Sequence, residues 1–168
     1  LIGLVGSEMC IRDSPSGCGK TTLLRLLMGL EAPDSGQIRI PEDTRFSAVF
    51  QEDRLLNRLT AAANVRLAAR ASIPQAAELL LELGIPPESL SQPVSTFSGG
   101  MKRRVALCRA LLAEYDVLTL DEPYKGLDED TRARVMRLVD VHTRGRTVIL
   151  VTHAAEEAAG YDLIHLPV

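Results

Sequence analysis

Residues 14–22, with the sequence SPSGCGKTT, constrain this chain more than any other stretch. Gly17 and Gly19 have no Cβ, so the backbone can curl there and turn successive N–H groups onto phosphate oxygens. Lys20 supplies a positive charge for the β- and γ-phosphates, and the Thr21 hydroxyl is placed to ligate Mg²⁺. The stretch therefore predicts a phosphate-binding loop that runs into a helix.

That helix is expected from Thr21 to about Leu30, with its positive dipole end aimed at the same anion. The usual pattern is Gly, four residues, then Gly-Lys-Ser/Thr, and this chain has Ser14 where the first Gly belongs. The alternative is a chance Gly-rich turn before an amphipathic helix. The residues predicted to hold the phosphates are Ser16, Gly17, Cys18, Gly19, Lys20, Thr21 and Thr22.

Residues 1–14 form a doubtful segment. The apolar run 1–6 is a candidate for the strand that enters the loop, but residues 7–13 intervene. Residues 4–13 also resemble the translation of a transposon-end adapter used to build sequencing libraries. The hypothesis is that residues up to about Ser14 are not native, which would explain the missing Gly. A genuine strand with an insertion is the alternative, and a genomic read of these codons would decide.

The composition of the chain argues against several classes of protein. A chain of 168 residues favours one domain with a single core, and a formal charge of −3 leaves no basic footprint for nucleic acid. Three cysteines without metal-like spacing argue against a disulfide framework and favour a reduced, cytosolic setting. Since no apolar run is long enough to span a membrane, a membrane role would need a partner.

Strand and helix patterns alternate along most of the chain. Since strands that alternate with helices after a phosphate loop form an open, mostly parallel sheet, the expected fold class is α/β. Residues 51–98 break the alternation, which predicts a small helical subdomain over about 55–113. Strands are expected at residues 37–40, 46–50, 117–120, 147–151 and 163–166, and further helices at 60–71, 75–83, 100–113, 128–141 and 154–159.

Two carboxylates follow the apolar run 117–120. Parallel strands end at the same sheet edge, so Asp121 is expected to face Mg²⁺, directly or through water. Glu122 is then placed to take a proton from an attacking water. The alternative is an ordinary helix-capping pair after a strand.

Two further polar side chains come at strand ends. His153 follows the next apolar strand, so it is expected to donate to the γ-phosphate and to orient the attacking water; the alternative is a polar boundary residue. Gln51 ends the strand at 46–50, and its amide can reach Mg²⁺ or the water. His142 and His165 have no such context and are interpreted as surface and structural residues.

Ser98, Gly99 and Gly100 open a predicted helix and predict a second anion site of the helix-N-terminus kind. An ordinary Ser N-cap with flexible glycines is the alternative. The basic run that follows, residues 102–104, is most simply interpreted as a solvated basic face; the alternative is that its charge adds to the field toward phosphate.

Together these motifs resemble the ATPase subunits of ABC transporters, over about Pro15 to the C-terminus. The resemblance implies a P-loop NTPase fold, ATP and Mg²⁺ as cofactors, and a head-to-tail dimer with two ATP molecules between the subunits. The motifs that carry it, in family order, are Gly17-Cys18-Gly19-Lys20-Thr21-Thr22, Gln51, Ser98-Gly99-Gly100, Leu120-Asp121-Glu122-Pro123, Gly126-Leu127-Asp128 and His153.

In such a dimer the phosphate loop of one subunit faces Ser98, Gly99 and Gly100 of the other, and Asp128 lies in the loop that crosses the interface. Lys20 and Thr21 hold phosphate and Mg²⁺, Asp121 supports the metal, Glu122 is the base, and His153 senses the γ-phosphate. Gln51 couples ATP state to a permease docked against the helical segment, which implies a place on the inner face of the membrane. Finer similarity is to importers of the nitrate, sulfonate and taurine type.

Three departures qualify the resemblance: Ser14, the absence of an aromatic residue placed to stack on adenine, and an early C-terminus. They suggest a truncated cassette, and its own ATPase competence stays open. Other interpretations are a soluble ABC-type ATPase of DNA repair or translation, another P-loop class such as a small-molecule kinase, and a non-catalytic fragment.

Overall fold

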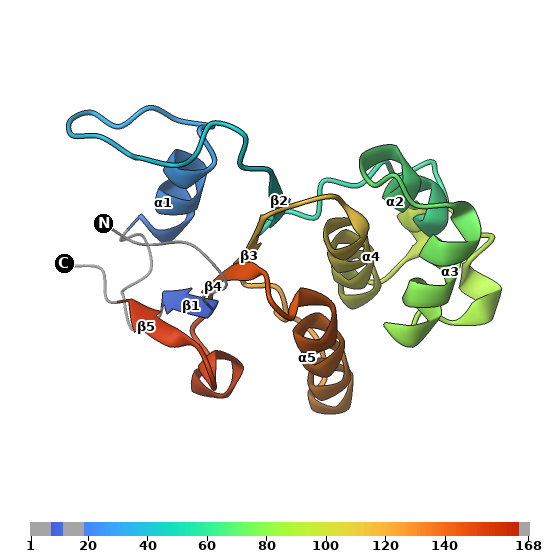
Figure 1. Cartoon of the computed structure of the whole chain (residues 1–168). Helices are drawn as coiled ribbons and strands as arrows, with labels where there is room; N and C mark the ends of the chain where they lie inside the picture. The colour runs from blue at the N-terminus through green and yellow to red at the C-terminus, as the bar shows by residue number, and fades with distance from the viewer. Residues whose placement is uncertain (1–7, 12–18, 165–168) are drawn as a thin grey trace. The chain divides into compact units, whose positions relative to one another are not determined.

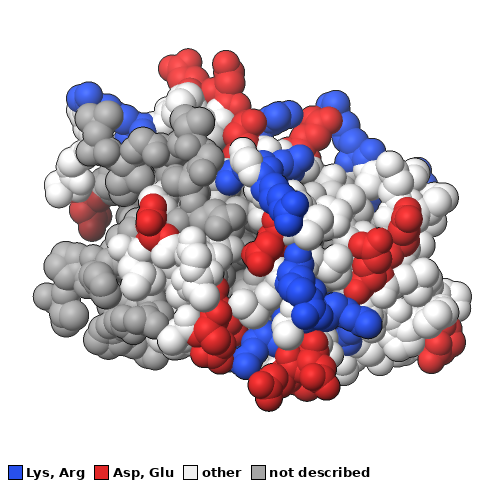
Figure 2. Space-filling model, turned by 60° about the horizontal axis from the view of Figure 1, so that its bottom comes forward, with Lys and Arg blue, Asp and Glu red and all other residues white. Residues whose placement is uncertain are grey.

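The computed structural model describes residues 8–11 and 19–164. The chain divides into two compact units. The sheet unit takes residues up to Ala48, Tyr115–Glu122 and the chain from Gly145 onward, and the helical unit takes Val49–Glu114 and Pro123–Arg144. Acidic and basic side chains are interspersed on the face that Figure 2 shows, in line with the small net charge.

The sheet unit is built on five strands in the order β2-β3-β4-β1-β5 (Figure 1). The pairs β1–β4, β1–β5 and β3–β4 are all parallel. This confirms the predicted α/β class with a parallel sheet. The strands are β1 (Glu8–Ile11), β2 (Phe46–Val49), β3 (Val117–Asp121), β4 (Thr147–Val151) and β5 (Asp162–Ile164).

Every residue of β3 and β4 is buried, as expected for central strands of a parallel sheet. Helix α1 (Lys20–Leu27) places Leu24 in a core cluster with residues of three strands. The strand residues of that cluster are Met9, Ile11, Val117, Ile149 and Val151. A hydrogen bond from the Thr21 hydroxyl to Asp121 places the first turn of α1 at the end of β3.

Four helices make up most of the helical unit: α2 (Ala61–Ala68), α3 (Ile73–Glu82), α4 (Gly99–Leu112) and α5 (Glu129–Thr143). Each begins at a side-chain cap that accepts a backbone N–H, which satisfies one of the donors left open at a helix start. The four capping residues are Thr60, Ser72, Ser98 and Asp128. Helices α2, α3 and α4 pack against one another around Val65, Leu80 and Leu107.

The structure corrects two sequence predictions. Residues 37–40 are not a strand; the alternating pattern is present, but these residues pair with no strand among the described residues. The strand before the phosphate loop is Glu8–Ile11, inside the segment that was expected to intervene, whereas the candidate run 1–6 lies outside the described residues. The hypothesis of a foreign segment stays a prediction.

Other expected elements are present with small shifts at their ends. The short helix at 154–159 is a single 3-10 turn, Ala155–Ala158, and further 3-10 turns at Pro87–Ser89 and Val94–Thr96 occupy the loop before α4. The boundaries of a helical subdomain over 55–113 stay a prediction. Within the described ranges, no helix has both the length and the apolar character that crossing a membrane requires.

Candidate functional site

Gly19 is the N-cap of helix α1, and its φ of 95° and ψ of 14° lie in the left-handed region that glycine adopts without strain. The Gly19 carbonyl accepts the first helical hydrogen bond from Leu23 N at 2.8 Å. Lys20 is the first residue of the helix and is buried. Three of the predicted phosphate-binding residues, Ser16, Gly17 and Cys18, lie outside the described residues, so the loop is seen only from Gly19 onward.

Thr21 and Asp121, both predicted near Mg²⁺, are in direct contact although they are 100 residues apart. The Thr21 hydroxyl donates to Oδ2 of Asp121 at 2.6 Å, and Asp121 is only 4% exposed. A hydroxyl and a carboxylate oxygen are ligands that Mg²⁺ accepts, with phosphates and waters completing its shell. The two residues therefore fit a magnesium site at the end of β3.

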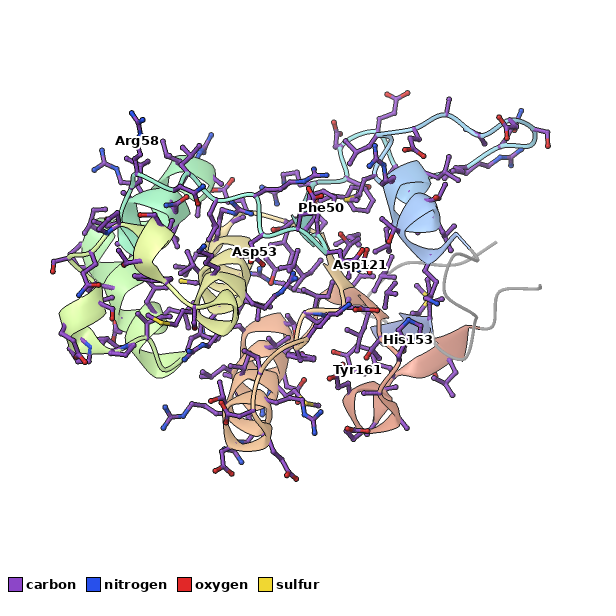
Figure 3. The ribbon with its side chains drawn as sticks, turned by 180° about the vertical axis from the view of Figure 1, so that it is seen from behind. Phe50, Asp53, Arg58, Asp121, His153 and Tyr161 are labelled. Carbon is purple, nitrogen blue, oxygen red and sulfur yellow. The ribbon has the colours of Figure 1, made fainter. Side chains whose placement is uncertain are left out.

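Glu122 follows Asp121 and is paired with His153. The Nε2 atom of His153 lies 3.2 Å from Oε1 of Glu122, and the Glu122 backbone N–H donates to the Val151 carbonyl at 2.8 Å. Since Asp121 pairs with Val151 in the parallel ladder, the two strands end together and bring Glu122 and His153 to one edge. Figure 3 labels Asp121 and His153 in this region. The pairing of a carboxylate with an imidazole suits proton transfer to or from a water.

The loop that carries His153 is held by a pair that sequence analysis missed. The buried Thr152 hydroxyl donates to the buried Glu157 carboxylate, and the same hydroxyl oxygen accepts from Ala154 N at 3.1 Å. These bonds fix the backbone on both sides of His153. A buried Glu six residues after the end of β4 has no sequence pattern that would have revealed it.

In the helical unit, Ser98 caps α4 by accepting from Met101 N at 3.2 Å. A Cβ added at Gly99 would meet no atom within 4 Å. One added at Gly100 would lie 3.2 Å from Cδ2 of Leu127 and 3.3 Å from the Gly126 carbonyl oxygen. Gly100 thus permits the segment before Asp128 to pack closely on the start of α4, while Gly99 leaves open space.

A cavity of about 490 Å³ lies at this junction. It brings together four residues that the sequence predicts to face a nucleotide: Ser98, Gly99, Gly100 and Asp128. Asp128 caps α5 by accepting from Thr131 N at 2.9 Å, and this hydrogen bond holds the pKa of its carboxyl below the usual value. The remaining lining residues are Asp53, Arg103, Arg104, Lys125, Gly126, Leu127 and Thr131.

The expectation of a solvated basic face at 102–104 is wrong. Arg103 is 7% exposed, and Arg104 donates to the carbonyls of Gly100, Leu83 and Gly84 at 3.1, 3.1 and 2.6 Å. Burial lowers the pKa of Arg104, although Asp128 acts against this shift. Helical periodicity could have revealed Arg103, because it shares a face with the buried residues Leu107, Ala110 and Leu111.

Gln51 lies in the helical unit, at the start of the loop after β2. Its side chain is exposed, and its backbone carbonyl accepts a hydrogen bond from Arg103. The structure therefore brings Thr21, Asp121, Glu122 and His153 together in the sheet unit. Gln51 and the residues of the predicted second anion site belong to the helical unit.

Most of this chain is similar in sequence to known proteins. A family profile described as "ABC transporter" matches residues 14–125. The chain is 44% identical over 150 residues to the aliphatic sulfonates import ATP-binding protein SsuB 1 of Rhodococcus jostii, covering 86% of this chain and 61% of that protein. It is 38% identical over 171 residues to the taurine import ATP-binding protein TauB of Pseudomonas aeruginosa, covering 94% and 65%. The chain thus spans about three fifths of the length of the curated relatives it matches.

Solved structures agree on the fold. A dimeric bacterial ABC transporter cassette, MJ0796, matches with a TM-score of 0.85 and 27% identity, covering 98% of this chain and 83% of that one. The same cassette in a post-hydrolysis state, bound to ADP and Pi, matches with a TM-score of 0.83 and 26% identity over the same shares of the two chains.

Proposed function

This chain belongs to the ABC transporter family, and we propose that it is an ATPase subunit that binds ATP with Mg²⁺ and hydrolyses it to energise solute import. The observation that carries the proposal is the arrangement at the end of β3. Thr21 contacts Asp121 at 2.6 Å, and the next residue, Glu122, lies 3.2 Å from His153. One edge of the sheet thus holds oxygen ligands for a metal beside a carboxylate–imidazole pair.

Each residue has a part in hydrolysis. Lys20 and the N-terminus of α1 bind phosphate, and Thr21 and Asp121 hold Mg²⁺, which neutralises charge on the phosphates when bound. Glu122 accepts a proton from the attacking water, and His153 orients that water and contacts the γ-phosphate. Because Thr152 and Glu157 fix the loop of His153, the imidazole needs little reorganisation to act.

The second anion site completes the proposal. Ser98, Gly99 and Gly100 would bind the γ-phosphate held by another subunit, with Asp128 nearby in the crossing loop. Two features support this: a Cβ at Gly99 would meet only open space, and the two predicted anion sites belong to separate units. The solved MJ0796 cassette is dimeric.

The partner that we propose is a membrane-spanning permease, docked on the helical segment and sensed through Gln51. The chain would then lie at the cytoplasmic face of the membrane. Similarity to SsuB and TauB supports an organosulfonate such as taurine as the imported solute.

The test is the substitution Glu122→Gln. We expect the purified variant to bind Mg-ATP, to form a dimer that depends on ATP, and to lose turnover by at least about 100-fold, because general acid–base catalysis contributes 10²–10⁴-fold. Phosphate release and light scattering measure the two effects. The exposed residue Glu88 supplies a matched control, since Glu88→Gln should change neither. Turnover of Glu122→Gln at the unsubstituted rate would remove Glu122 as the base.

A further inference from the structure

We infer that Arg103 is a positioning residue for Gln51, fixing the Gln51 loop to the helix that begins at the second anion site. The inference rests on the proposed function, in which Gln51 senses the permease, and on the sequence prediction that its amide reaches Mg²⁺ or the attacking water. Its basis is the set of contacts between α4 and residues 50–54, all within the helical unit.

All three nitrogens of the Arg103 guanidinium contact this loop, two through hydrogen bonds and one through an ion pair. Nη1 donates to the Phe50 carbonyl at 2.6 Å and Nη2 donates to the Gln51 carbonyl at 2.5 Å. Nε lies 3.2 Å from Oδ1 of Asp53. Figure 3 shows Phe50 and Asp53 along the segment that leaves β2, with Asp53 beside α4. One side chain therefore holds the two peptide groups on either side of Gln51.

Burial makes this arrangement costly to break. A buried guanidinium is tolerated only when its N–H groups are paired, and Arg103 is 7% exposed. Its planar fork fits two successive carbonyls, which a lysine ammonium cannot match. Burial also raises the pKa of Asp53, although Arg103, Lys102 and Arg109 act against this shift. Arg103 is buried and Asp53 is only partly exposed, so each charge stabilises the other.

A second arginine of α4 holds the other end of the loop. Arg109 donates to the carbonyls of Arg54 and Asp53 at 2.8 and 3.0 Å. Arg54 has φ 48°, a left-handed backbone that is uncommon outside glycine, and its guanidinium stacks on the Phe50 ring at 4.1 Å. The loop is therefore a strained turn kept in place by four carbonyl hydrogen bonds from one helix.

Through Arg103, α4 connects its own N-terminus to the Gln51 backbone. Ser98 caps α4, and Arg103 lies little more than one turn along the same helix. Because the backbone of a helix is stiff, a displacement of its N-terminus by a bound phosphate is passed to the Gln51 backbone through Arg103. Arg103 does not touch the nucleotide in this proposal; it acts through Gln51.

The experiment is a double-mutant cycle of Arg103→Met with Gln51→Ala, measured as kcat and KM for Mg-ATP. We expect Arg103→Met to lower kcat about tenfold with KM within about twofold, and to have no further effect in the Gln51→Ala background. Arg103→Lys should recover part of the loss, because it restores the charge and one donor. Arg66→Met is the matched control, because Arg66 is an exposed arginine on α2 of the same unit; we expect kcat within about twofold of the parent.

Amide hydrogen exchange of residues 50–54 tests the contact without any turnover. Faster exchange in Arg103→Met, with the rest of α4 still protected, supports the clamp. Additive losses in the cycle, or an equal loss of kcat in Arg66→Met, would overturn the inference and leave the proposed function intact. If the unsubstituted protein hydrolyses no ATP, the proposed function fails, and the role of Arg103 in catalysis fails with it.

Discussion

At the residue scale, Glu122 and Arg54 share an unusual backbone. They are the two non-glycine residues of the described ranges with positive φ, at 47° and 48°. Such a conformation costs on the order of 1–3 kcal/mol and persists where surrounding contacts impose it. For Glu122 the contact is the hydrogen bond of its N–H to Val151, and for Arg54 it is the Arg109 guanidinium. Both strained residues lie in loops to which we assign a function.

Cys108 gives a prediction about a single thiol. It is fully buried in α4, and burial raises its pKa from 9.0 to about 12. Since the thiolate is the reactive form, we expect Cys108 of the folded protein to resist iodoacetamide at pH 8 and to react in denaturant. Because the folded pKa of this acid is raised, stability from the neutral thiol is present at neutral pH and is lost as pH approaches about 12.

Peptide mass spectrometry of the alkylated protein checks this prediction. Labelling should be set by unfolding, so it should accelerate with urea in step with the loss of helix signal. Rapid labelling of Cys108 under native conditions would contradict the packing of α4 in the helical unit.

At the scale of elements, the first turn of α4 has two roles that substitution can separate. Ser98 caps the helix through Met101 N, and it is also our proposed ligand for a phosphate. Ser98→Ala should cost about 1 kcal/mol of stability, as loss of a cap does. Ser98→Asp should keep the cap and the stability, because Asp caps well and suits the helix dipole, but its charge should abolish dimerisation by ATP.

Ser72 supplies the matched control, since it caps α3 in the same way within a capping box. We expect Ser72→Asp to leave ATP-dependent dimerisation unchanged. Urea unfolding and light scattering with Mg-ATP separate the two effects. If Ser98→Asp dimerised at the same ATP concentration as the unsubstituted protein, Ser98 would act only as a helix cap.

Elements differ in how far the sequence predicts them, for physical reasons. The strands β3 and β4 are predictable because they are continuous apolar runs of a type found in the centre of parallel sheets. The pattern at 37–40 is similar in kind to a strand, but a strand needs a neighbour to pair with, and residues 37–40 alone do not specify one. Local pattern therefore identifies buried elements better than exposed ones.

The candidate site also contains residues that the sequence predicts and one that it does not. Thr21, Asp121, Glu122 and His153 are predictable because parallel strands deliver their carboxyl ends to one edge, and the structure brings these residues together there. Arg103 is not predictable from its charge, since arginine is rarely buried, and two of its partners are backbone carbonyls that carry no side-chain pattern.

At the scale of the whole molecule, Lys20 connects ATP binding to the stability of the folded protein. A ligand that binds only the folded state stabilises it by about 2.7 kcal/mol at a concentration 100 times its Kd. In a chain of this length that raises Tm by about 5–10 °C. Lys20 is the first residue of α1, where its charge adds to the dipole of the helix.

We therefore expect Lys20→Ala to lose most of the Tm shift that Mg-ATP produces in the unsubstituted protein. The substitution also removes a buried side chain, so Tm without nucleotide can change too, and the quantity that tests the prediction is the shift and not Tm itself. Lys102→Ala is a suitable control because Lys102 is a basic residue outside the proposed site. An equal shift in all three proteins would contradict the assignment of Lys20 to phosphate, since the nucleotide would then be bound without it.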